Sequence, residues 1–147
     1  MDALLSLLKN IQQHSQQLLD CLKHEKQLLD SNQLDTLNDV SSQKQQLLIK
    51  LDQLDKQRSA NTPKSDFNLF ITNTHNSTLI KQWDISRRAI AACQKQNEIN
   101  GRIISRHSHL NQDVLSILTG RDQPADETYN SQGNQTRKSS LLNEIKV

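Results

Sequence analysis

The stretch that decides the fold is residues 77–120, whose centre reads Cys93-Gln-Lys-Gln-Asn97-Glu-Ile-Asn100-Gly101-Arg-Ile-Ile. Small, apolar or uncharged polar residues recur along it at alternating steps of four and three. This is the 3.5-residue period of a helix that packs lengthwise on other helices. We call this series the seam: Leu79, Trp83, Ser86, Ile90, Cys93, Asn97, Asn100, Ile104, His107, Asn111, Val114 and Leu118.

A second apolar row widens the seam, and a basic row lies opposite to it. The second row predicts a helix that contacts two neighbours rather than one. Basic residues that recur every seven positions are typical of the solvated side of such a helix, and a nucleic-acid surface is the weaker interpretation. The second row is Ala89, Ala92, Ile99, Ile103, Leu110 and Ile117, and the basic row is Lys81, Arg88, Lys95, Arg102 and Arg106.

The polar seam residues Asn97, Asn100 and the adjacent Gly101 allow two interpretations. A buried Asn in a seam fixes the register of the helices, and a glycine beside it lets a neighbouring backbone approach closely. Alternatively, this layer is weak enough for the bundle to open or shift for a partner, because Gly in a helix interior is unfavourable relative to Ala.

Two further helices are expected before this stretch. Residues 2–30 carry an apolar seam that begins with Leu4, Leu8 and Ile11, and Asp2 occupies the first turn, where the helix dipole favours a carboxylate. Residues 37–58 repeat the same spacing after a polar break at Ser31-Asn32. Because the connection is so short, the two helices are predicted to form an antiparallel hairpin.

The hairpin should end near Pro63, which cannot continue a helix. Residues 67–71 are predicted to form a short helix that is capped by Ser65 or Asp66 and covers one end of the bundle. We expect a break near His75, followed by a new N-cap at Asn76 or Ser77.

After Gly120 the composition becomes polar, and residues 121–147 are predicted to be a flexible tail. Tyr129 is its one large aromatic anchor, and Leu141, Leu142 and Ile145 would share a face if the end became helical. The fold class is therefore all-α: an elongated antiparallel bundle of three long helices plus a short helix. The bundle domain spans residues 1–120, with a flexible tail at 121–147 that carries a short inducible helix.

Composition argues against several functional classes. The hydrophobic fraction of 33% and aromatic fraction of 3% favour a thin, long core, and the net charge of +2 gives no case for a nucleic-acid partner. No apolar run is long enough to insert directly into a membrane, and the start lacks the basic region of a signal peptide, so a cytoplasmic protein is expected. Cys21 and Cys93 are predicted to be buried thiols.

No catalytic pattern is present in the sequence. His107 and His109 are two residues apart and point to different sides of a helix, so they do not form a metal pair. The three glycines are scattered, which excludes a phosphate-binding loop. We expect no enzyme activity, no cofactor and no metal.

At this point the chain resembles the FlgN family of flagellar type III export chaperones over nearly its whole length. The first hairpin is similar through Glu25 and Lys44, each of which precedes a pair of leucines, and through Arg58. The most specific part is an ordered set of motifs: Asn97-Glu-Ile-Asn100-Gly101, then Leu110-Asn111-Gln112-Asp-Val114, then Tyr129 followed four residues later by Gly133.

The resemblance implies a cytoplasmic helical chaperone that binds the hook–filament junction proteins FlgK and FlgL through their C-terminal helical segments. Such a chaperone keeps its substrates unpolymerised and passes them to the cytoplasmic domain of the export gate protein FlhA. It also implies that Tyr129, with Gly133, docks on FlhA. Leu141, Leu142 and Ile145 are put forward as substrate contacts.

A self-associating coiled-coil structural adaptor is the alternative from a different class. The terminal apolar residues and the motif from Tyr129 to Gly133 favour the chaperone, because a scaffold gives no reason for them. The sequence leaves a monomer and a homodimer both open, since a free seam can close within one chain or between two.

Overall fold

The computed structural model describes residues 1–62 and 66–119, and its regular elements in these ranges are helices without a strand. The all-α class with three long helices and one short helix is confirmed. The boundary at residue 120 and the tail at 121–147 lie outside the described residues and remain predictions. The elements are α1 (Asp2–Asp30), the 3₁₀ turn η1 (Leu34–Thr36), α2 (Leu37–Ala60), α3 (Phe67–Asn73) and α4 (Ser77–Thr119).

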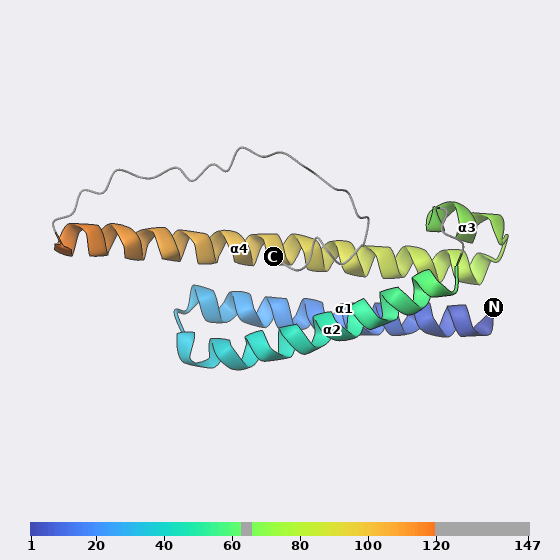
Figure 1. Ribbon diagram of the computed structural model, residues 1–147, viewed down its shortest axis with the longest axis horizontal. Helices are drawn as coiled ribbons and strands as arrows, with labels where there is room; N and C mark the ends of the chain where they lie inside the picture. The colour runs from blue at the N-terminus through green and yellow to red at the C-terminus, as the bar shows by residue number, and fades with distance from the viewer. Residues whose placement is uncertain (63–65, 120–147) are drawn as a thin grey trace.

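Helix α1 is the central element of the bundle. It forms the predicted antiparallel hairpin with α2, and α4 runs parallel to it on another side (Figure 1). No Cα atom of α2 comes within 8 Å of a Cα atom of α4. The long helix α4 thus contacts two neighbouring helices, α1 along its packed length and α3 near its own start. At the end of α2, the Arg58 guanidinium also lies 5.9 Å from the centroid of the Trp83 ring of α4.

The turn between α1 and α2 is a Schellman motif built on Asn32. Its φ of 55° places this residue in the left-handed region, which Asn tolerates better than most residues. The backbone N–H of Gln33 donates to the carbonyl of Leu28 at 2.9 Å, and that of Asn32 donates to Leu29 at 3.3 Å. These two bonds satisfy carbonyls at the end of α1 and reverse the chain.

Both predicted caps around the short helix α3 are confirmed. Asp66 begins α3, and its Oδ1 accepts a hydrogen bond from the backbone N–H of Asn68 at 2.8 Å. The break falls at His75, whose φ is 52°. Asn76 then caps α4 by accepting hydrogen bonds from Thr78 and Leu79 at 3.1 and 3.2 Å.

Helix α3 covers one end of the bundle, as predicted, through an aromatic cluster. The ring of Phe67 meets the ring of Trp83 edge-on at a centroid distance of 4.7 Å. The guanidinium of Arg58, at the end of α2, lies 4.5 Å from the Phe67 centroid and forms an ion pair of 2.8 Å with Asp55. This cluster fixes the start of α4 against the hairpin.

Candidate partner-binding site

Helices α1 and α4 are joined by a hydrogen bond that repeats every two turns. Each bond links residues 78 positions apart, which means that the two helices are parallel and in constant register. The donors belong to the seam of α4, and the acceptors are backbone carbonyls of α1. The three bonds are Ser86 Oγ to Leu8 at 3.0 Å, Cys93 Sγ to Ser15 at 3.0 Å, and Asn100 Nδ2 to Leu22 at 2.8 Å.

Asn100 also connects all three long helices. Its side chain is fully buried, and its Nδ2 donates to the carboxylate of Glu25 on α1 at 2.7 Å. Lys44 of α2 donates to the same carboxylate at 3.3 Å. Because Glu25 is itself 3% exposed, these two donors replace the water that its carboxylate loses on burial. The structure thus places Asn100 in the seam, and Asn97 is buried there as well.

The close backbone approach expected at Gly101 is absent. Gly101 is exposed on the outer side of α4, and a Cβ atom added to it would meet no heavy atom within 4 Å. One residue after Asn100, the helix has turned by about 100° and its next position faces away from α1.

The buried part of the seam ends at Asn100, although the pattern of the sequence continues to Leu118. Helix α1 ends at Asp30, which lies level with Ser108 in the register of the hydrogen-bond series. The last turns of α4 therefore extend past the hairpin of α1 and α2 (Figure 1). Beyond this point no other helix of the described chain lies beside α4.

The end of α4, from Ile104 onward, exposes apolar side chains, and most of them belong to the seam or to the second row. Half of the large hydrophobic side chains that are exposed in residues 1–62 and 66–119 fall in this one short stretch. Ile117 and Leu118 are 79% and 76% exposed. Such a concentration is typical of a surface that another molecule covers and makes this stretch the candidate partner-binding site, whereas single exposed apolar residues need no explanation. We call these six residues the terminal face: Ile104, Leu110, Val114, Leu115, Ile117 and Leu118.

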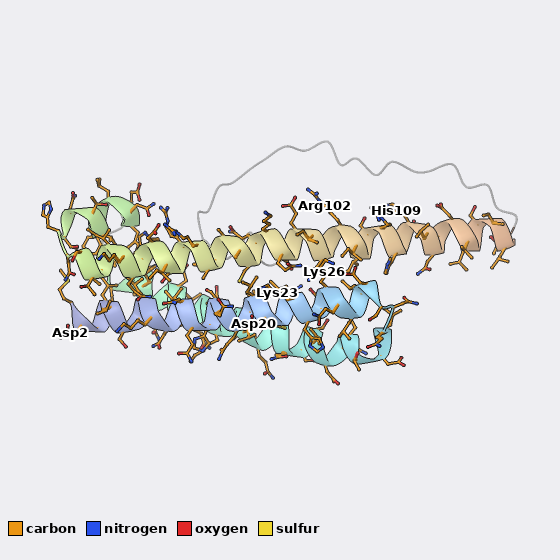
Figure 2. The ribbon with its side chains drawn as sticks, turned by 180° about the vertical axis from the view of Figure 1, so that it is seen from behind. Asp2, Asp20, Lys23, Lys26, Arg102 and His109 are labelled. Carbon is orange, nitrogen blue, oxygen red and sulfur yellow. The ribbon has the colours of Figure 1, made fainter. Side chains whose placement is uncertain are left out.

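Polar and charged side chains surround the terminal face. Figure 2 shows Arg102 and His109 on the side of α4 that points away from α1, while Lys23 and Lys26 lie at the edge of α1 nearest to α4. The end of α4 is therefore amphipathic, with one apolar side and one charged side. A partner can approach the apolar side past the end of α1.

The basic row of α4 is exposed, and two of its members form ion pairs. Arg88 pairs with Asp84 at 2.7 Å, and Arg102 pairs with Glu98 one turn earlier. These acidic neighbours neutralise part of the row, which favours the interpretation as a solvated helix side.

The two thiols are buried and unlinked, as predicted. Cys21 Sγ donates to the carbonyl of Val40 at 3.6 Å, so that it contacts α2, whereas Cys93 contacts α1. Burial raises the pKa of both thiols, and that of Cys93 reaches about 12. Both side chains are therefore protonated and unreactive near neutral pH.

The described chain shows little sign of a small-molecule, metal or membrane site. An open hollow of about 340 Å³ lies at the end of the bundle between Met1, Leu4, Asn61 and Phe70, and it contains no charged side chain. Among residues 1–62 and 66–119, no group of three or more His, Cys, Asp or Glu residues is arranged to hold a metal ion. Within the same ranges, no helix has the length and hydropathy needed to cross a membrane.

The binding residues predicted from the sequence, Tyr129, Gly133, Leu141, Leu142 and Ile145, lie outside the described residues, and their assignment remains a prediction. The terminal face, in contrast, was missed as a site. All but Leu115 belong to the seam or to the second row, so they look like core residues in the sequence. The signal that could have found it is length, because residues 77–119 form a far longer helix than residues 2–30.

The fold and the terminal face together define an all-helical protein with one projecting helix whose end carries exposed apolar side chains. A protein-family model described as FlgN protein matches residues 1–137. The chain belongs to this family, which assigns it in general to the flagellar export chaperones. Comparison with curated proteins gave no match, and none of the solved structures matched.

Proposed function

We propose that this chain is a cytoplasmic export chaperone that binds FlgK and FlgL, prevents their premature assembly and delivers them to FlhA. Membership of the FlgN family supports the general role, and the choice of partners is our proposal. It is a binding function, for which we propose neither a catalytic step nor a cofactor or metal. We propose no nucleic acid as a partner and no direct insertion into the membrane.

The terminal face is the observation that carries this proposal. An amphipathic helix can place its apolar residues along such a surface, with contacts that recur at helical spacing. The resemblance to the family implies that FlgK and FlgL are bound through helical C-terminal segments. We infer that one such segment packs along α4 between Ile104 and Leu118, where the bundle leaves the seam exposed.

The terminal face alone is small, which gives the tail a role in binding. Residues 103–118 of a helix are about 24 Å long, and a contact about 10 Å wide would bury only about 240 Å² on α4. Stable interfaces bury about 800 Å² on each partner. We therefore propose that Leu141, Leu142 and Ile145 close over the bound segment and enlarge the contact.

Docking on the export gate is assigned to Tyr129 and Gly133. Tyr129 lies ten residues after Thr119. At about 3.4 Å per residue, it can therefore be at most about 35 Å from the end of α4. The proposed gate contact is thus tethered close to the substrate-binding face. Replacing Tyr129 by Ala should weaken binding to the FlhA cytoplasmic domain and leave FlgK binding unchanged.

Isothermal titration with the C-terminal segment of FlgK tests the substrate site. The chain with Leu110→Ser and Ile117→Ser should lose about 30-fold in affinity, because burial of two partly exposed aliphatic side chains contributes about 2 kcal/mol. Ile49→Ser on α2 is the control, because Ile49 is 52% exposed and Leu110 is 56% exposed, and this variant should bind normally. A negative heat-capacity change should accompany binding.

Two outcomes would contradict the proposal. Equal affinity of the terminal-face variant and the control would show that the segment binds elsewhere. No heat with FlgK or FlgL, together with a concentration-dependent dimer mass of the free chain, would instead support the self-associating structural adaptor.

A further inference from the structure

We infer that, before a substrate binds, the terminal face of α4 is covered by residues 141–145 of the same chain. This inference rests on the proposed function, because it concerns the regulation of the same binding surface. It assigns to Leu141, Leu142 and Ile145 a place in the free protein as well as in the complex.

The terminal face needs a cover because the bundle ends too early to supply one. From Ser86 to Asn100, each seam residue of α4 that bonds to α1 is buried. The seam then continues to Leu118, and beyond Ser108 it has no neighbouring helix in the described chain. A cover that follows the seam would extend an existing interface rather than create a new one. It would take the place that α1 occupies earlier along α4.

The last residues of the chain have the side chains for this contact. Among residues 120–147, the aliphatic side chains larger than alanine are Leu141, Leu142, Ile145 and Val147. Positions 141, 142 and 145 share one face when that segment is helical.

The length of the connecting chain permits this arrangement. About 20 residues separate Thr119 from Leu141. At about 3.4 Å per residue they span up to about 70 Å, whereas the stretch 103–118 is about 24 Å long. The segment can therefore reach any part of the terminal face. Tethering gives it an effective concentration in the millimolar range, so a weak contact is sufficient.

A second copy of the chain is the less suitable occupant. Two terminal faces packed on each other would bury roughly 500 Å² in total, well below the 1,200 Å² or so of a stable association. The tethered segment does not depend on protein concentration, so the same small area is sufficient for it.

Covering makes substrate binding an exchange of partners. The segment 141–145 leaves α4 when FlgK or FlgL arrives, and it then packs on the outer side of the bound helix. The fraction of chains with an open face limits the apparent association rate. Solutions of the free chaperone are also protected from aggregation through the apolar side chains of α4.

Paramagnetic relaxation in the free, full-length chain tests the cover directly. A nitroxide is attached to Ser140→Cys, and the buried Cys21 and Cys93 are expected to remain unlabelled because their thiols are protonated. Backbone amides of residues 103–118 should lose intensity strongly, while those of residues 2–20 should not. The matched control carries the same label together with Leu141→Ser, Leu142→Ser and Ile145→Ser, and it should recover most of the intensity.

Each other outcome overturns the inference. Equal broadening in the control would reflect tethering alone, and absence of broadening would leave the face open. Broadening of unlabelled, isotope-enriched chains by added labelled chains would identify a second copy as the occupant. The experiment contains no substrate, so its result is independent of whether FlgK or FlgL binds.

Stopped-flow association gives a second, kinetic measure. Deleting residues 139–147 should raise the association rate constant for the FlgK segment about two- to tenfold, as expected when half to nine-tenths of the chains are covered. An unchanged or lower association rate constant would overturn the cover. The dissociation rate constant reports separately on the proposed closure of the tail over the bound segment.

Discussion

Asn100 and Gly101 are adjacent in the sequence, yet substitution by Ala should change the stability of the protein in opposite directions. In Asn100→Ala the bonds to the Glu25 carboxylate and to the Leu22 carbonyl are lost. A hydrogen bond to a charged group contributes about 1.5–3 kcal/mol and a neutral one about 1 kcal/mol. Ala has the better helix propensity by about 0.5 kcal/mol, so the net loss should be about 2–3 kcal/mol.

Gly101→Ala should raise the free energy of unfolding by about 0.5–1 kcal/mol, because Ala restricts the unfolded chain and fits the helix. No atom lies within 4 Å of the position that the new methyl group would take. The two variants therefore differ by about 3 kcal/mol at neighbouring positions. The contrast tests the orientation of the seam.

Urea unfolding followed by far-ultraviolet circular dichroism measures both free energies. The slope of the free energy against urea should be the same in all three proteins, which indicates equal exposure of surface on unfolding. Asn100→Ala within 0.5 kcal/mol of the parent would refute the buried connection to Glu25. A destabilised Gly101→Ala would show that this position contacts another part of the protein.

Three further predictions concern the bundle. Ser15 Oγ is buried without a hydrogen-bond partner among the described residues, so Ser15→Ala should raise the free energy of unfolding by about 1 kcal/mol in the same urea assay; a loss would reveal a bond to this hydroxyl. Lys44→Met leaves the buried Glu25 carboxylate with one donor fewer and should lower stability by about 3 kcal/mol, whereas adding Glu25→Gln should recover part of the loss; no recovery would contradict the ion pair. Burial raises the pKa of Cys93 to about 12 from an ordinary 9.0, so that between these values only the thiol of the unfolded chain ionises. The free energy of unfolding should therefore fall as pH rises above 9.0, and it should fall less in Cys93→Ala. Equal slopes of the free energy of unfolding against pH in the two proteins would refute this contribution.

Much of the fold is predictable because local signals and the apolar period agree. The helix at residues 2–30 follows from its apolar period. The Asn32 turn, the Asp66 cap and the break at His75 follow from polar residues that favour turns and caps. The arrangement of the three long helices is harder to predict. The second row of α4 predicts a second neighbour but not its position, and in the structure that neighbour is α3, which meets α4 only near its start.

The binding surface shows the limit of periodicity more clearly. Ile90 and Leu118 occupy equivalent seam positions, but one is buried and the other is 76% exposed. The difference arises because α1 ends before it reaches the last turns of α4, which is a property of the register between two distant segments. Gly101 illustrates the same limit. A close backbone approach was expected there because it follows the seam residue Asn100, but its own position on the helix faces away from α1.

The most direct test of the account is hydrogen exchange, measured by mass spectrometry, of the full chain with and without the FlgK C-terminal segment. The account predicts that residues 109–119, which extend past the end of α1, exchange faster in the free protein than residues 79–100 and gain protection in the complex. The hairpin of α1 and α2 should be unchanged. Protection that increases in α1 or α2 instead, with no change in residues 109–119, would contradict the assignment of the terminal face as the substrate-binding surface.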